Sequence, residues 1–501
     1  MTAPSTDLRH IGHFIGGRAV PGLSGRTAPV YDPARGVQTA EVALASVAEV
    51  DAVVASAVEA SGDWRSSSLT RRASLLFRLR ELLDANRGEL AAAVTREHGK
   101  VLEDARGEVA RGIENVEFAC GIPNLLKGSS NSEISTGVDI RTVLEPLGVV
   151  AGITPFNFPI MVPLWMMANA IACGNCFVLK PSEKDPSASL VLADIVQRAG
   201  FPDGVFSVVQ GDRDAVEALL AHPDVAAVSF VGSTPVARHI YETGTRQGKR
   251  VQALGGAKNH MVVMPDADID AAADAAVSAA YGSAGERCMA ISVVVAVGPV
   301  ADPLVEAIVS RIPDVVIGAG DEEASMMGPL ITAEHRARVQ SYVTGAADEG
   351  AKVVVDGSNP GRESGFFVGC SLLDDVKPGM RVYDDEIFGP VLSVVRVPTL
   401  DEALTLVNDN PYGNGTAVFT RDGGSARRFE REVQVGMVGI NVPIPVPVAS
   451  HSFGGWKDSI FGDSSIYGPD GIRFCTRPKV VTSRWPDPGP GSMELHFPTN
   501  H

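Results

Sequence analysis

The feature that most limits the possible folds of this chain is an alternation of short β-rich segments with longer helical ones, which starts near residue 149. Strands that are apolar on both sides indicate a parallel sheet that is covered on both faces. Because crossovers between parallel strands are right-handed, the pattern predicts a doubly wound α/β domain. The expected strands lie at 149–153, 177–180, 205–210, 226–232 and 250–254.

A second α/β region is expected from Asp266 onward, because 501 residues are too many for one hydrophobic core. It opens with an Ala-rich helix at 268–285. Proline cannot donate to a strand ladder, so the Pro-rich segment 442–448 is not expected to form a central strand. Strands are expected at 291–297, 352–356, 391–397 and 415–420, and further helices at 301–312, 333–350, 400–409 and 423–433.

The charge and the cysteine content restrict the partners and the compartment. With 43 basic and 60 acidic residues the net charge is -17, which argues against nucleic acid or an anionic membrane as a partner. Six cysteines are no disulfide framework and are typical of a reducing compartment. The first residues contain no apolar signal core, so we expect a cytoplasmic protein.

One apolar window, Ile160 to Leu179, has about the length that a bilayer requires. It contains Pro163, Asn169 and a Gly174-Asn175 turn signal. A buried helix, a turn and a buried strand explain these residues better than a membrane span does. No membrane partner is therefore predicted.

Two groups of polar residues follow expected strands, where ligands bind in open α/β sheets. Gly232, Ser233 and Thr234 open a helix, whose free amides suit a pyrophosphate, although Ser and Thr are also ordinary N-caps. Lys180 and Glu183 could bind ribose hydroxyls. The alternative is that they form a charged loop exposed to solvent. The residues alone leave both alternatives open, since the chain has neither a GxGxxG fingerprint nor a P-loop.

Three cysteines stand in recognisable surroundings. Cys288 has Arg287 beside it, and a neighbouring cation lowers the pKa of a thiol and favours the nucleophilic thiolate. Cys173 and Cys176 form a C-x-x-C string without a second pair or a His cluster, which favours two buried thiols over a zinc or redox site. No metal site is predicted.

Six strings occur in the order and approximate spacing of the aldehyde dehydrogenase family, which this chain resembles over roughly residues 10–485. They are PFNFP (155–159), KPSE (180–183), FVGST (230–234), LGG (254–256), GERC (285–288) and EIFGP (386–390). RGIENVEFAC, ITPFNFP, GERCMA and NVPIPVP look like the branch of methylmalonate-semialdehyde dehydrogenases, which transfer their acyl group to coenzyme A.

The resemblance implies the aldehyde dehydrogenase fold and its division into domains. A doubly wound NAD-binding domain would comprise 1–123 and 147–254, and an α/β catalytic domain 255–447. A small β oligomerisation arm would comprise 124–146 and 470–486, and 487–501 would be a loosely attached tail. Such enzymes are dimers or tetramers, so we expect a homodimer or homotetramer.

The resemblance also assigns roles to individual residues. Cys288 would be the nucleophile, and the Asn157 amide and the Cys288 backbone N–H would form the oxyanion hole. Because a carboxylate at Glu183 repels a 2′-phosphate, NAD is expected rather than NADP. The implied cofactor residues are Thr154 and Phe156 along the cleft, Lys180, Glu183 and Lys184 at the adenosine ribose, Ser233 at the pyrophosphate, Gly255 at the nicotinamide, and Glu386 and Phe388 at the nicotinamide ribose.

Arg111 and Arg287 are the expected contacts for the carboxylate of a semialdehyde substrate. An anionic substrate needs a fixed cation in an acidic protein, and the planar guanidinium suits a carboxylate. The alternative is that Arg111 is a solvated helix charge and that Arg287 only tunes the cysteine.

One departure from the wider family concerns the acyl acceptor. Hydrolytic members read E-L-G-G, with a glutamate that activates water, whereas this chain has Ala253 in that place. A missing general base costs a factor of about 10²–10⁴ in rate, while a thiol attacks a thioester without that help. Coenzyme A is therefore the expected acceptor, and propionyl-CoA or acetyl-CoA, carbon dioxide and NADH are the expected products, as in valine or inositol catabolism. A hydrolytic enzyme that makes a free acid, and a catalytically silent binding or structural protein, are the alternatives.

Overall fold

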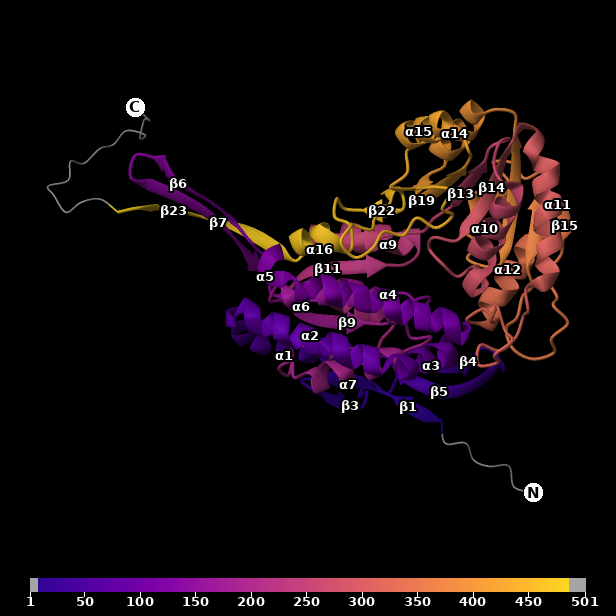
Figure 1. Cartoon of the computed structure of the whole chain (residues 1–501). Helices are drawn as coiled ribbons and strands as arrows, with labels where there is room; N and C mark the ends of the chain where they lie inside the picture. Colours follow the sequence, from indigo (N-terminus) through magenta and orange to yellow (C-terminus); the bar gives the residue numbers. More distant parts are fainter. Residues whose placement is uncertain (1–7, 486–501) are drawn as a thin grey trace, which may run out of the picture.

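The computed structural model describes residues 8–485, and its largest sheet is the doubly wound one that the sequence predicts (Figure 1). Five parallel strands form its middle, in the order β12-β11-β8-β9-β10, and short antiparallel strands extend both edges. The parallel strands are β8 (Val149–Ile153), β9 (Cys176–Lys180), β10 (Phe206–Val208), β11 (Val225–Val231) and β12 (Arg250–Leu254), and the edge strands are β2 (His13–Ile15), β3 (Arg18–Val20) and β22 (Ile460–Phe461).

The strand order reverses between β8 and β11, with β9 and β10 on one side of this point and β12 on the other. Ligands bind outside the carboxyl ends of the strands at such a switch point. The four strands around it end at Ile153, Lys180, Val231 and Leu254. Most of the predicted cofactor residues lie at or just after these ends, whereas Glu386 and Phe388 precede β17 (Val391–Val397) of the second α/β region.

Helices pack against this sheet and against one another. Some of them begin at a side-chain cap: Ser46 and Glu49 form a capping box at the start of α1, and Asp212 caps α8. The helices are α1 (Val47–Ser66), α2 (Leu69–Ala85), α3 (Arg87–His98), α4 (Leu102–Cys120), α5 (Ile122–Leu125), α6 (Met161–Ala172), α7 (Ser187–Ala199), α8 (Arg213–Ala221) and α9 (Thr234–Arg246).

The apolar window Ile160–Leu179 is a buried helix, a turn and a buried strand, which confirms its interpretation from the sequence. Every residue of α6 is buried, and the helix packs along α4. Gly174 makes the turn with a φ of +96°, and β9 follows it. Among residues 8–485 no helix is both long enough and apolar enough to span a membrane.

A second sheet has its own hydrophobic core, as expected from Asp266 onward. Its strand order is β15-β16-β17-β14-β13-β19-β20, and all neighbouring pairs except β15 and β16 are parallel. The sequence predicts β14, β15, β17 and β19 but misses the others. The strands are β13 (Asn259–Val263), β14 (Ile291–Val297), β15 (Lys352–Val355), β16 (Ser371–Asp374), β17 (Val391–Val397), β19 (Gly415–Phe419) and β20 (Met437–Ile440), and the helices are α10 (Ile269–Tyr281), α11 (Ala301–Arg311), α12 (Ala333–Gly345), α13 (Arg381–Asp384), α14 (Leu400–Asp409) and α15 (Gly423–Glu432).

A three-stranded antiparallel arm projects from the body of the molecule (Figure 1). It joins β6 (Ser129–Ser135) and β7 (Val138–Pro146) to the distant β23 (Thr476–Arg484), which follows α16 (Gly468–Phe474). The predicted tail 487–501 lies outside the described residues. The Pro-rich 442–448 contains no strand, as expected. The remaining strands are β1 (Arg9–Ile11), β4 (Thr27–Asp32) and β5 (Val37–Ala43) in one small sheet and β18 (Tyr412–Gly413) and β21 (Trp456–Lys457) in another.

Candidate active site

One cavity of about 1240 Å³ lies at the carboxyl ends of the parallel strands and extends to the second sheet. All the catalytic and cofactor residues that the sequence predicts line it, whereas Arg111 and Arg287 are not among its lining residues. The predicted residues in the lining are Thr154, Phe156, Asn157, Lys180, Glu183, Lys184, Ser233, Gly255, Cys288, Glu386 and Phe388.

The polar residues after β9 and β11 are placed for a ligand. Lys180 is buried, and its Nζ lies 3.3 Å from Glu183 Oε2, so this is no solvated loop. Ser233 occupies the N-cap position of α9, but its side chain makes no capping hydrogen bond within the described structure. Its hydroxyl is therefore available to a ligand. The first residues of α9 also line the cavity, so the amino-terminal end of the helix borders it.

The backbone around Cys288 is held by two asparagines. The Cys288 carbonyl oxygen accepts hydrogen bonds from Asn259 Nδ2 at 2.9 Å and Asn414 Nδ2 at 3.0 Å. Just before it, Ser283 and Ala284 have φ values of +53° and +52°. Left-handed backbone at non-glycine residues is costly and persists where the surroundings enforce it. The loop thus carries Cys288 in a fixed conformation.

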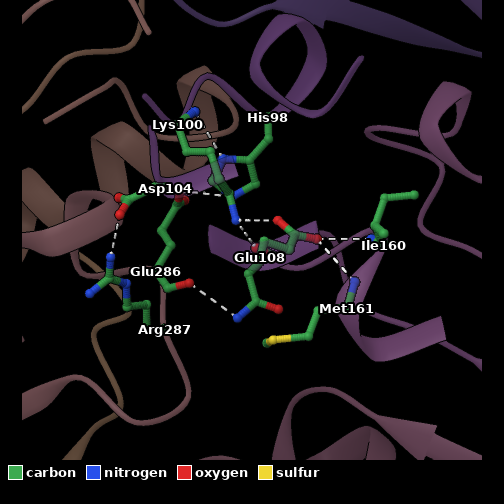
Figure 2. Close-up of polar contacts among 9 residues, drawn as sticks. His98, Lys100, Asp104, Glu108, Ile160, Met161, Glu286 and Arg287 are labelled. Atoms are coloured by element: carbon green, nitrogen blue, oxygen red, sulfur yellow. Dashed lines mark hydrogen bonds and ion pairs between the residues drawn. The ribbon is translucent and has the colours of Figure 1, made fainter. Parts of the chain in front are cut away.

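The sequence predicts that Arg287 lowers the pKa of the Cys288 thiol. This prediction is wrong, because the net shift of that pKa is upward. Burial raises this pKa to about 12, and the nearby charge of Glu386 raises it further. Arg287 acts in the opposite direction but is the weakest influence. Its Nη2 instead donates to Asp104 Oδ1 at 2.8 Å (Figure 2). A carboxylate partner already compensates the charge that was expected to act on the thiol.

The side-chain amide of Asn157 is anchored on the loop of the cysteine. Its Nδ2 donates to the backbone carbonyl of Glu286 at 3.1 Å, and the residue is 3% exposed. An amide nitrogen has two N–H groups, so one remains for a ligand in the cavity. Because the first N–H is fixed, the direction of the second is fixed as well.

Glu386 lines the same cavity. Burial raises the pKa of its carboxyl to about 7, although the Ala257 amide donates to Oε1 at 3.0 Å. Gly255 beside it leaves no room for a side chain, because a Cβ would lie 2.7 Å from the Asp458 carbonyl oxygen. The ring of Phe388 packs edge-on against that of Phe156, with centroids 5.8 Å apart.

The two predicted substrate arginines already have protein partners. Arg111 donates from Nη1 to Glu114 at 2.7 Å and from Nη2 to the Pro447 carbonyl at 3.2 Å. The same carbonyl accepts from the Tyr467 hydroxyl at 2.7 Å. Arg111 is thus no solvated helix charge, because it connects α4 to the Pro-rich segment.

Several residues of the site carry no signal that sequence reasoning used. His335 and Arg338 line the cavity from α12, and His335 Nε2 hydrogen-bonds the Phe388 carbonyl at 2.7 Å. Behind the cavity wall lie the buried Lys100 and Glu108. Within residues 8–485, no group of three or more His, Cys, Asp or Glu side chains is arranged for a metal ion. Cys173 and Cys176 are buried free thiols.

A profile of the aldehyde dehydrogenase family matches residues 20–481. The chain belongs to the aldehyde dehydrogenase family. It is 54% identical over 478 residues to the malonate-semialdehyde dehydrogenase of Pseudomonas aeruginosa, which covers 95% of this chain and 96% of the relative. The methylmalonate-semialdehyde dehydrogenase of Oceanimonas doudoroffii has a similar structure, with a TM-score of 0.95, 52% identity and coverage of 96% and 99% of the two chains.

A third comparison adds a cofactor. A Sinorhizobium meliloti protein described as a methylmalonate-semialdehyde dehydrogenase, solved in complex with NAD, has a TM-score of 0.95 and 51% identity, with 96% and 99% of the two chains covered. These comparisons confirm the family resemblance and the fold class that the motifs indicate.

The raised pKa of Cys288 predicts how this aldehyde dehydrogenase reacts with an alkylating agent in the absence of substrate. Only the thiolate is nucleophilic, so iodoacetamide labelling of Cys288 should accelerate about tenfold per pH unit from pH 7 to pH 10. The rate is followed by mass spectrometry of the Cys288 peptide. A small free thiol, measured in parallel, should level off near its pKa of about 8.5. A plateau for Cys288 below pH 9 would contradict the role of burial.

Proposed function

We propose that the chain oxidises methylmalonate semialdehyde and malonate semialdehyde with NAD, and transfers the acyl group to coenzyme A with loss of carbon dioxide. The observation that carries the proposal is that Cys288, Asn157 and the predicted cofactor residues line one cavity. The relatives that are about half identical carry the names of these two activities. The products are propionyl-CoA or acetyl-CoA, carbon dioxide and NADH.

The residues of the cavity fit NAD. Ser233 and the start of α9 would hold the pyrophosphate, Lys180 and Glu183 the adenosine ribose, and Glu386 the nicotinamide ribose. Gly255 would lie at the nicotinamide, and a side chain at this position would collide with the Asp458 carbonyl oxygen. Bound NAD accepts the hydride that the aldehyde carbon loses. Because Glu183 is a carboxylate, it repels the 2′-phosphate of NADP.

Cys288 supplies the covalent chemistry. Its sulfur attacks the aldehyde carbon, and the carbonyl oxygen gains negative charge that the Asn157 amide and the Cys288 backbone N–H stabilise. Removing one such donor costs about 2.7–4 kcal/mol of barrier in comparable sites. Loss of the hydride leaves a thioester on Cys288, and loss of carbon dioxide from the acyl group precedes its transfer.

The surroundings of Ala253 favour a thiol as the acyl acceptor. Ala253 is fully buried in β12, paired with Phe230 and Phe461, and its methyl group cannot activate water. Coenzyme A attacks the thioester without a base of that kind. One observation favours the hydrolytic alternative: Glu386 lines the same cavity as Cys288, and its pKa of about 7 suits a general base.

We also propose a homodimer or homotetramer in the cytoplasm. The arm of β6, β7 and β23 presents exposed apolar side chains, such as Ile134 and Val480, which are 52% and 59% exposed. An apolar surface on a projecting sheet suits contact with another subunit. A catalytically silent role is disfavoured, because Cys288, Asn157 and Glu386 are all in place.

If Cys288 is the nucleophile, Cys288→Ala should abolish NADH formation and still bind NAD. The reason is that no other side chain forms the thioester. NADH is followed by absorbance, and NAD binding by calorimetry. Cys370→Ala is the matched control, because Cys370 is a buried thiol outside the cavity, and it should keep most of the activity. Substantial turnover by Cys288→Ala would overturn the assignment.

If coenzyme A is the acceptor, steady turnover should require it. Without it, methylmalonate semialdehyde and NAD should give a burst of about one NADH per site and then a rate at least about 10²-fold lower. Burst kinetics and mass spectrometry of the acyl product measure this. Continued turnover to a free acid without any thiol would establish the hydrolytic alternative. Loss of that turnover in Glu386→Gln, with the NADH burst and NAD binding retained, would then identify the base.

If Arg111 and Arg287 bind the substrate carboxylate, replacing either by Leu should lower kcat/KM for methylmalonate semialdehyde far more than kcat/KM for propanal. A lost charge-assisted contact costs about 1.5–3 kcal/mol, or about 10- to 150-fold in kcat/KM. Arg106→Leu is the control, since Arg106 lies on the same helix in an exposed pair with Glu103. Equal losses on both aldehydes would show that the two arginines are structural.

A further inference from the structure

A buried ion pair lies behind the oxyanion donor, and the proposed mechanism does not use it. Lys100 follows α3 and is 1% exposed, and Glu108 lies in the middle of α4 and is 3% exposed. Their Nζ and Oε2 atoms are 2.8 Å apart (Figure 2). Neither side chain lines the cavity, so neither contacts a ligand there.

The pair holds the segment that joins β8 to α6 from two directions. Lys100 Nζ donates to the backbone carbonyl of Asn157 at 2.5 Å. The other oxygen of Glu108, Oε1, accepts from the amides of Ile160 at 2.8 Å and Met161 at 3.2 Å. One ion pair therefore fixes a carbonyl at residue 157 and the first amides of the helix that follows.

Stability alone is a poor reason for such a pair. Desolvation of two buried charges costs as much as or more than their attraction returns, and apolar replacements of buried pairs are often neutral or stabilising. Here the lysine Nζ also lies 4.2 Å from the centroid of the Phe158 ring, and its charge interacts with the buried Asp185 and Glu286. What the pair supplies is a defined position for the backbone that it binds.

That backbone belongs to Asn157, whose side chain is anchored separately. The side-chain Nδ2 donates to the carbonyl of Glu286, two residues before Cys288. Lys100 fixes the main chain of Asn157, and Glu286 fixes its amide group. Together the two contacts determine where the remaining N–H of the amide points.

We propose that Lys100, held by Glu108, is a positioning residue that sets the Asn157 amide at the place where the oxyanion forms. This rests on the proposed roles of Asn157 and Cys288. Oxyanion donors act at 2.7–3.1 Å from the developing charge, and a displacement of about 1 Å can cost about 10²-fold in rate. Loss of Lys100 therefore slows formation of the thioester and leaves the reactivity of the thiol itself intact.

A double-mutant cycle with Lys100→Met and Asn157→Ala tests the proposal. Asn157→Ala removes the amide and keeps the backbone carbonyl that Lys100 binds. The readouts are the rate of the NADH burst with methylmalonate semialdehyde, KM for the aldehyde, and the rate of iodoacetamide labelling of Cys288. The labelling reaction forms no oxyanion, so it reports on the thiol alone. Each single variant should slow the burst about 10- to 10³-fold with labelling unchanged.

The decisive quantity is the effect of Lys100→Met in the Asn157→Ala background. If Lys100 acts through the amide, the second change should slow the burst by less than about threefold there. Additive losses would overturn the proposal, and so would a parallel fall in iodoacetamide labelling, which would mean that the cysteine loop itself is disturbed. An unaffected burst in Asn157→Ala would instead refute the oxyanion role of Asn157, on which this inference rests.

Lys100→Met leaves the Glu108 carboxylate buried without a counter-ion, which can prevent folding. The variant Lys100→Met/Glu108→Gln buries no charge and serves in its place. This variant should show the same slowed NADH burst and normal iodoacetamide labelling. In the Asn157→Ala background the two changes should no longer slow the burst. A wild-type burst in this folded double variant would overturn the proposal.

Discussion

One hydrogen bond joins the two halves of the proposed site, from Asn157 Nδ2 to the Glu286 carbonyl. Asn157 follows β8 of the first sheet, whereas Glu286 belongs to the loop that leads into the second. The backbone of Cys288 is tied to that second sheet, because Asn259 begins β13 and Asn414 precedes β19. The two proposed oxyanion donors thus lie on segments that are tied to different sheets. Their separation depends on how the two sheets are placed relative to each other, and this bond spans the junction between the two segments.

Helix α4 supports that junction from one face. Asp104, Glu108 and Arg111 are spaced by four and three residues, so they lie on the same side of the helix. Asp104 pairs with Arg287, the neighbour of Cys288 in the chain. Glu108 holds Lys100 and the start of α6, and Arg111 donates to the Pro447 carbonyl. A rigid helix therefore sets three segments that are far apart in the sequence. Figure 2 shows the first two of these contacts side by side.

The sequence predicts well what depends on short-range pattern. The apolar strands of the doubly wound sheet and their carboxyl ends follow from periodicity, and the motif residues converge on one cavity. β13 is missed because it opens with Asn259 and His260, polar residues that are satisfied only by partners distant in the chain. Lys100 is missed for the same reason, because its proposed role depends on a hydrogen bond to the carbonyl of residue 157, which is distant in the chain.

The one wrong expectation about chemistry has the same origin. Beside Cys288, Arg287 suggests a lowered thiol pKa, yet burial and Glu386 outweigh it, and Asp104 compensates its charge. How far a side chain is desolvated, and which partner it finds, are properties of the folded chain. Neither property can be read from the residues that are adjacent in the sequence.

Desolvation is the largest influence on the pKa values of Cys288 and Glu386, which line this cavity, and of the buried Lys258. It raises the pKa of Cys288 to about 12 and of Glu386 to about 7, and lowers the pKa of Lys258 to about 8. Such surroundings favour neutral groups, so the charge that appears during reaction meets few mobile counter-ions. Fixed dipoles have to stabilise it, and in a low-dielectric site they are strong only at the right distance. In the proposed mechanism the position of the Asn157 amide therefore matters more than another nearby charge, and a buried ion pair that contacts no ligand affects the rate through that position.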